Sequence, residues 1–362
     1  MSGEAEIVER HPELYFPTGD VALRAAFPST PGSVPRFQIF RVHKVILGLH
    51  SAAFSNLFAD ASAGLGPTYD DVPMVEMPDR ADDLAGLLDC VYNPSHYYLS
   101  RRSRRYKTAL ELSGIVRLAD KYLLDSLRAD LVQRVVDEWP KDILEWDIRE
   151  AELEKIKTAI MCGTQEQSSY YMDCMPEPAS AIMFAEEFGC REVLPAAFCS
   201  LARVGIHNEW EKAHEGGGYT SMLFARWTCL DSKNLLRFIR GCEYLDRHHE
   251  SISQCIQDGV MLSPSCMPWW TLEKPVDHSR ARDDEPYPCL RFIKRLRDAE
   301  WAGYYVHDPM GGLQTLLDCT SAPSNAFLRD LCGSCHGTFR RWVRDQRNSV
   351  WKRMPRIFEL DQ

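Results

Sequence analysis

The residues whose types and spacing could do chemistry lie near the end of the sequence, at Cys332-Gly-Ser-Cys335-His336-Gly337. Two cysteines three positions apart can supply two zinc ligands, with Cys319, His336 or Cys289 completing a set of four. The letters Cys-x-x-Cys-His also match a haem-attachment string, which needs an exported protein. Gly333-x-Cys335-x-Gly337 imitates a nucleophile elbow, but that turn belongs between a strand and a helix of a βαβ sheet.

A structural explanation of the two cysteines competes with these chemical ones. At 100° per residue, Cys332 and Cys335 share one helical face with apolar side chains, namely Leu328, Phe339, Trp342, Val343, Val350 and Met354. A thiol on such a face behaves as a small hydrophobic group. Structural zinc usually shows two paired ligand sets, and only one pair is visible here. We therefore expect Cys332 and Cys335 to belong to a buried core without metal or cofactor, and keep zinc as the alternative.

Composition limits the class of protein. The chain has 362 residues, 45% of them hydrophobic and 26% charged, which is typical of a globular protein with room for two domains. A formal net charge of −10 argues against general nucleic-acid binding, which needs clustered positive charge. No run of 18 apolar residues could span a membrane, and the acidic start lacks a signal peptide's apolar core. Thirteen cysteines in such a chain predict reduced thiols, and hence a cytoplasmic or nuclear location.

The predicted secondary structure that would position any site changes along the chain, from strands and helices to helices alone. Residues 19–42 predict a hairpin with a long Pro- and Gly-rich connection, in which Val21, Leu23 and Ala25 alternate with polar or small neighbours. From Val45 the period becomes helical: Val45, Ile46 and Leu49 predict the buried face of one helix, and Ser51 is placed to cap the next. Residues 72–77 predict a third strand that stops at Pro78. After residue 140 the strand signals end and helical periodicity continues.

The stretch 40–58 resembles the central motif of the BTB/POZ domain. The matching residues are Phe40, Val42, His43, Lys44, Ile46, Leu47, Ser51, Phe54, Leu57 and Phe58. Gly19-Asp20-Val21 resembles the opening of the family's first strand, and the helix 110–127, with Ala119-Asp-Lys-Tyr122, resembles its late helix. The resemblance implies an α+β fold over residues 1–140, a sheet of three or more strands flanked by helices. It gives a structural role to Asp20, Phe40, His43, Lys44, Leu47, Ser51, Phe54, Phe58, Ala119 and Tyr122.

The second half resembles the helical part of BTB proteins that are abundant in mushroom-forming (basidiomycete) fungi. The resemblance rests on the segments 178–201, 230–241, 331–335 and 350–360. It implies an all-helical domain over residues 141–362, with a Pro- and charge-rich excursion near 263–290. That half brings no assigned chemistry, and we find no paired carboxylates or Ser/His/Asp set in a supporting context, so we expect no enzyme.

The family resemblance implies protein–protein association. BTB domains self-associate, and many present substrates to cullin-3 ubiquitin ligases, so a ligase adaptor is the first expectation and a transcriptional or scaffold protein the alternative. The resemblance places Asp20 and Lys44 at a shared pocket, with a stabilising, partly buried charge at Asp20. It also places a second copy on the outer side of the first helix, where Lys44, Gly48 and His50 would offer little apolar area. We expect a monomer or weak dimer that binds cullin-3.

Overall fold

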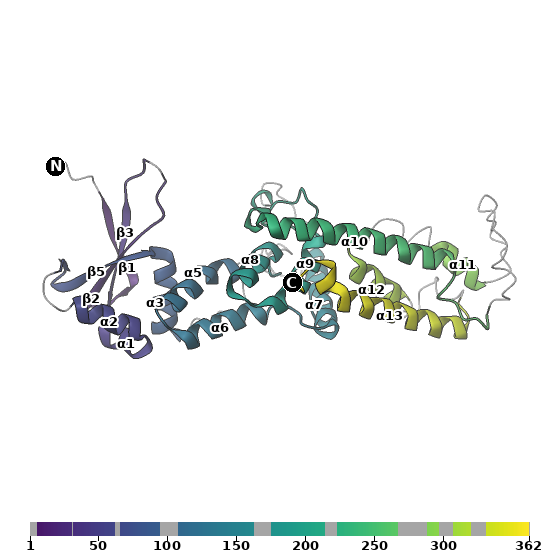
Figure 1. Ribbon diagram of the computed structural model, residues 1–362, viewed down its shortest axis with the longest axis horizontal. Helices are drawn as coiled ribbons and strands as arrows, with labels where there is room; N and C mark the ends of the chain where they lie inside the picture. The colour runs from purple at the N-terminus through teal and green to yellow at the C-terminus, as the bar shows by residue number, and fades with distance from the viewer. Residues whose placement is uncertain are drawn as a thin grey trace. The chain divides into compact units, whose positions relative to one another are not determined.

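The computed structural model describes residues 6–30, 32–61, 66–94, 108–162, 175–213, 223–266, 288–296, 307–319 and 331–361. The chain divides into two compact units (Figure 1). The first contains residues 1–138 and 173–176, and the second contains 139–172 and 177–362. Most of the predicted excursion, residues 267–287, lies outside the described residues.

The first unit is built on a five-stranded sheet with the strand order β1-β3-β2-β5-β4. Its strands are β1 (Ile7–Tyr15), β2 (Val21–Ala26), β3 (Arg36–Val42), β4 (Thr68–Tyr69) and β5 (Val72–Arg80). The predicted hairpin is confirmed, because β2 and β3 pair antiparallel from Val21 with Val42 to Ala26 with Phe37. The outer strand β1 pairs with β3 in parallel, and β2 pairs in parallel with β5.

The central strand β2 is buried on both faces over its first three residues. Ala22 is as inaccessible as Val21 and Leu23, so the expected alternation was wrong there, whereas Arg24 is partly exposed and Ala26 is exposed, so the alternation holds from Leu23 to Ala26. A strand with neighbours on both edges and cover on both faces reads as a continuous apolar run. The prediction that the third strand stops at Pro78 was also wrong, since β5 runs to Arg80.

The described helices of the first unit are α1 (Lys44–His50), α2 (Ala52–Ala61), α3 (Ala81–Tyr92), α5 (Thr108–Lys121) and α6 (Asp125–Val136). Of these, α2 and α3 contact strands of the sheet, α5 packs on α3, and α6 packs on α5. The predicted single helix 110–127 is interrupted at Leu123, which has a positive φ of 57°. The backbone N–H of Leu124 donates to the carbonyl of Ala119 at 2.8 Å, the bond of a left-handed helix end. The chain turns there because Leu124 is buried while Leu123 faces solvent.

The second unit is helical throughout its described residues, apart from one isolated bridge between Glu209 and Ala225. Its α-helices are α7 (Ile143–Met161), α8 (Pro178–Phe188), α9 (Leu194–Ala202), α10 (Ser232–Gln257), α11 (Pro288–Arg295), α12 (Pro309–Cys319) and α13 (Gly333–Ile357). The two longest, α10 and α13, run beside each other and pack together (Figure 1). Near their junction the ring of Phe358 stacks on that of Phe198, with centroids 5.1 Å apart.

None of the helices that the structure describes is both long enough and apolar enough to cross a membrane.

Candidate functional site

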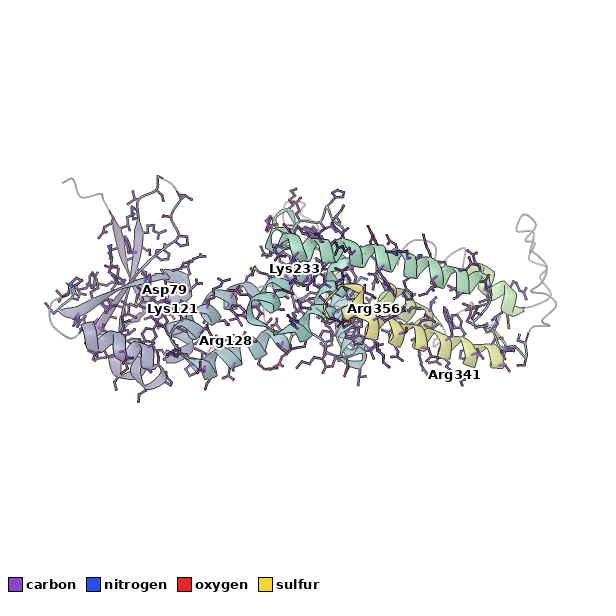
Figure 2. All side chains as sticks on the ribbon, viewed as in Figure 1. Asp79, Lys121, Arg128, Lys233, Arg341 and Arg356 are labelled. Carbon is purple, nitrogen blue, oxygen red and sulfur yellow. The ribbon has the colours of Figure 1, made fainter. Side chains whose placement is uncertain are left out.

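The residues singled out by the 40–58 motif form the core of the first unit. The Phe54 ring stacks on that of Tyr122 with centroids 4.4 Å apart, and the Tyr122 hydroxyl hydrogen-bonds to Asp79. Asp79 also receives a salt bridge from Lys121 at 2.5 Å, and both are labelled in Figure 2. The apolar motif residues are inaccessible or nearly so: Phe40, Leu47, Phe54, Phe58 and Ala119. Their positions are those of packing residues.

Two polar motif residues hold helix ends. The Ser51 hydroxyl accepts a hydrogen bond from the Phe54 backbone N–H at 3.0 Å, which confirms the predicted cap of α2. The same hydroxyl donates to the carbonyl of Tyr122 and so ties α2 to the end of α5. His43 precedes α1, and its backbone N–H donates to the Tyr92 hydroxyl at 2.9 Å while its Nε2 hydrogen-bonds with Thr18 Oγ1 at 3.0 Å.

Asp20 and Lys44 meet through the backbone and not through a buried charge. The carboxylate of Asp20 accepts a hydrogen bond from the Lys44 backbone N–H at 2.8 Å. Asp20 itself is exposed, so the expected partly buried charge was wrong. A short helix has free N–H groups at its start, and the carboxylate of Asp20 satisfies one of them at the first residue of α1.

We expect Asp20→Ala to lower the free energy of unfolding by about 1 kcal/mol, because the first N–H of α1 loses its acceptor. Asp20→Asn keeps an acceptor oxygen and should cost less. Urea unfolding at neutral pH measures both, with Asp125→Asn, at an acidic residue in the first turn of α6, as the control. Equal losses for Ala and Asn at position 20 would contradict the capping role.

The outer face of α1 is more apolar than the sequence suggested. Only Leu47 is buried in this seven-residue helix. Val45 and Leu49, expected on the buried face, are 67% and 78% exposed. The prediction failed because so short a helix buries one turn, and Leu47 points inward there. Beside the exposed pair lies a shallow groove of about 310 Å³ lined by Lys44, Val45, Gly48, Leu49, Ser55 and Phe58.

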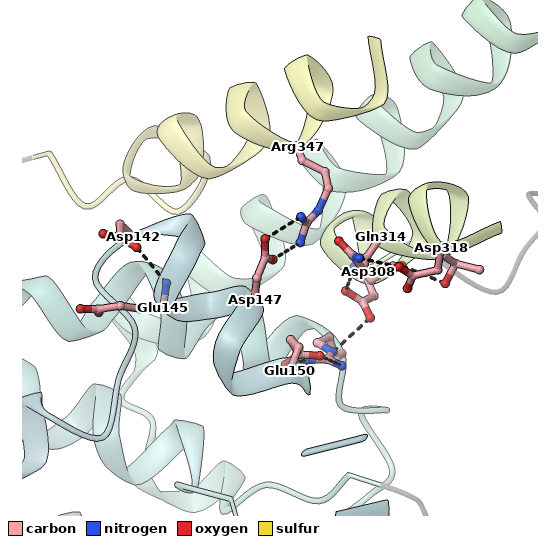
Figure 3. A network of polar contacts seen from close by, with 11 residues as sticks. Asp142, Glu145, Asp147, Glu150, Asp308, Gln314, Asp318 and Arg347 are labelled. Carbon is pink, nitrogen blue, oxygen red and sulfur yellow. Dashed lines mark hydrogen bonds and ion pairs between the residues drawn. The ribbon is translucent and has the colours of Figure 1, made fainter. Parts of the chain in front are cut away.

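A second, larger hollow lies in the second unit, a cleft of about 1140 Å³ between α7, α12 and α13. Figure 3 shows its polar wall, where Asp147 faces Arg347. The two arginine Nη atoms donate to both carboxylate oxygens of Asp147, one of them at 3.0 Å. In the same wall, Arg203 forms ion pairs with both Glu150 and Asp308.

Arg203 is held by two carboxylates of this cleft. Its Nη1 and Nη2 atoms donate to Glu150 at 2.8 and 2.9 Å, and its Nε lies 3.1 Å from Asp308. Burial alone would lower the pKa of Arg203, but Asp308 and Glu150 raise it above its usual value. Arg203 neutralises the carboxylates of Glu150 and Asp308, as is typical of structural ion pairs. That the chain is not an enzyme stays a prediction.

The structure separates the two cysteines of the Cys-x-x-Cys motif. Cys335 is buried in the first turn of α13, whereas Cys332 is exposed and precedes the helix as its N-cap. The expected continuous apolar face was therefore wrong at Cys332, because the helix begins only at Gly333. The Sγ of Cys332 accepts a hydrogen bond from the backbone N–H of Cys335 at 3.5 Å, as a capping side chain does.

Both motif cysteines belong to a group of four. Their sulfur atoms and two others all lie within 4.8 Å of one another, and the residues are Cys266, Cys289, Cys332 and Cys335. Burial raises the pKa of the Cys335 thiol to about 11, and the N–H of Cys335 lowers that of the Cys332 thiol to about 7. Four thiols converging on one point are a possible ligand set for a soft metal ion.

The sequence indicated part of this group. Cys289 was named as a third ligand, whereas His336 is not in the group and the side chain of Cys319 lies outside the described part. Cys266 was missed. It lies at the start of the predicted excursion and Cys289 lies at its end, so the signal was a cysteine on each side of an irregular stretch. Such a pair is brought together only if the stretch closes as a loop.

Neither a protein-family model nor a curated protein nor a solved structure matches the chain.

Proposed function

We propose that the chain is a protein–protein interaction module whose first unit pairs with a second copy through the outer face of α1. The observation that carries the proposal is the exposure of Val45 and Leu49 beside the groove floored by Gly48. An isolated exposed leucine needs no explanation, but a protruding apolar pair next to a hollow is a complementary surface. The resemblance to BTB domains supports the same face.

A second copy fits this surface because one face carries both the protruding side chain and the hollow. In a twofold pair each Leu49 would lie over the groove of the other copy, so every favourable contact occurs twice. Gly48 keeps the hollow open because it has no side chain. A Cβ at this position would occupy part of the groove and lie 3.7 Å from the Ser55 Cβ. Two protruding apolar side chains per copy are a small area, so the dimer is expected to be weak and reversible.

Sedimentation equilibrium of the full chain tests the proposal. We expect a concentration-dependent dimer whose Kd rises by more than about tenfold in Leu49→Glu, because a buried leucine is worth about 1.5–3 kcal/mol and is lost twice. The matched control is Leu144→Glu, at a leucine that is 65% exposed on α7. It should leave the Kd unchanged.

Two outcomes would overturn self-pairing. One is a chain that stays monomeric at high micromolar concentration, and the other is a dimer that Leu49→Glu does not weaken. A monomer that binds cullin-3 in a direct titration, with binding lost in Leu49→Glu, would assign the same face to a ligase adaptor. A dimer without cullin-3 binding would favour the scaffold role.

A further inference from the structure

We propose that Cys266, Cys289, Cys332 and Cys335 bind one structural zinc ion that joins three helices of the second unit. Their four sulfur atoms lie within 4.8 Å of one another. In a tetrahedral site with Zn–S bonds of about 2.3 Å, the sulfurs are about 3.8 Å apart. The observed grouping therefore has the size of a single-ion site. The inference is independent of self-pairing, which concerns the first unit.

The sulfur atoms are not joined to each other. All four cysteines are free, and the Sγ atoms of Cys266 and Cys289 are 3.5 Å apart, whereas a disulfide requires about 2.05 Å. Two disulfides would draw the sulfurs into separate pairs, but here each sulfur is close to the other three. The arrangement is the one that a shared central cation would hold.

Backbone N–H groups point at three positions of the cluster. The N–H of Cys332 donates to Cys289 Sγ at 3.2 Å and the N–H of Ser263 donates to Cys335 Sγ at 3.4 Å. The N–H of Cys335 donates to Cys332 Sγ at 3.5 Å. Such outer hydrogen bonds orient ligating atoms and stabilise the negative charge of thiolates. The sulfurs of Cys289 and Cys335 receive these hydrogen bonds from other segments of the chain, so more than one segment orients the ligands.

The ligands come from three places that the sequence keeps apart. Cys266 follows α10, Cys289 lies in the first turn of α11, and the remaining two lie at the start of α13. These ends meet in the fold, where the ring of Phe292 packs edge-on against that of Phe339 at 5.3 Å between centroids. A zinc ion would tie them together at a position where the chain offers a small apolar core.

The donor set identifies the ion and its role. Four thiolates select a soft or borderline cation, whereas Mg²⁺ and Ca²⁺ take oxygen ligands. With all four tetrahedral positions filled by protein, no position is left for a substrate or water, so the role is structural. Cys335 is buried and Cys332 is exposed, which gives the ion a route from solvent.

Elemental analysis of the full chain, purified under reducing conditions, tests the site. We expect about one zinc per chain, the stoichiometry of a single four-ligand site. In Cys332→Ser the zinc content should fall well below half, although serine still caps α13 and so preserves the helix start. The matched control is Cys162→Ser, at an exposed cysteine outside the cluster, which should keep its zinc. Cys266→Ser serves as a second ligand variant, and circular dichroism verifies that each variant is folded.

Cobalt titration of chelator-stripped protein gives a second readout. We expect the visible bands of tetrahedral Co²⁺ with thiolate charge transfer in the near ultraviolet, displaced by added Zn²⁺. Absence of both zinc and cobalt binding would overturn the proposal. So would zinc that persists in both ligand variants, stoichiometric iron in place of zinc, or a non-reduced mass showing disulfides among the four cysteines.

Discussion

Arg203→Met is expected to destabilise the second unit by about 3–5 kcal/mol, the cost of breaking a buried ion pair from one side. The side chain of Arg203 is only 14% exposed and satisfies two carboxylates, Glu150 and Asp308, on opposite sides. Methionine fills much of the same volume but donates no hydrogen bond. The two carboxylates would then lie close together, poorly solvated and without their cation.

Urea unfolding followed by tryptophan fluorescence measures this loss, since the Arg203 guanidinium lies 5.9 Å from the ring of Trp146. Unpaired neighbouring carboxylates bind protons more readily in the folded chain than in the unfolded chain, so the deficit should shrink as the pH falls from 7 to 5. Adding Glu150→Gln to Arg203→Met should restore part of the stability at pH 7.

The control for this prediction is Arg247→Met, at an arginine whose side chain is 72% exposed and whose ion pair with Glu243 spans 4.0 Å. Its effect should stay within about 0.5 kcal/mol. An Arg203→Met variant that unfolds at the wild-type urea concentration would show that the buried charges contribute nothing net.

Gly241→Ala is the second change with a large expected cost, about 1–3 kcal/mol from overpacking. A Cβ at position 241 would lie 2.1 Å from two ring atoms of Phe358. That ring is inaccessible and stacked on Phe198, so it cannot move without disturbing the core between α9 and the end of the chain. Alanine ordinarily favours a helix, and here the contact should reverse that preference.

The same substitution at Gly337 separates the contact from helix propensity. Gly337 lies inside α13, where an added Cβ would meet nothing within 4 Å. Gly337→Ala should therefore stabilise by up to about 1 kcal/mol, opposite in sign to Gly241→Ala. Thermal unfolding compares the two, and the double variant Gly241→Ala with Phe358→Leu should lose less than the sum of its parts. Equal effects at both glycines would rule out the close contact with Phe358.

Local signals in the sequence predicted local structure well. The cap of α2 by Ser51 depends on a hydrogen bond to Phe54, which is only three residues away. The exposed pair Val45 and Leu49 was assigned to the wrong face because a periodicity over seven residues does not define which side is covered. Strand β1 was missed because most of its residues are exposed and it pairs with the distant β3.

In the cysteine cluster too, the residues close in sequence were predicted and those distant in sequence were not. The pair Cys332 and Cys335 was visible as a motif, because its members are three residues apart. Cys266 and Cys289 are brought to it by the packing of α10, α11 and α13, which no local pattern encodes. The mistaken helical face extended the periodicity of α13 back past its start at Gly333, through Cys332 to Leu328, which lies outside the described residues.

The assignment of residues 173–176 to the first unit has a consequence for how the molecule comes apart. The chain passes between the units at three points, after 138, after 172 and after 176. A protease that cuts once between these first two points produces two fragments, and each fragment contributes residues to both units. The second fragment then carries Met175 and Pro176, which are buried and belong to the first unit, so the first fragment lacks them. Dissection at a single peptide bond near residue 140 therefore removes a piece of the unit it is meant to isolate.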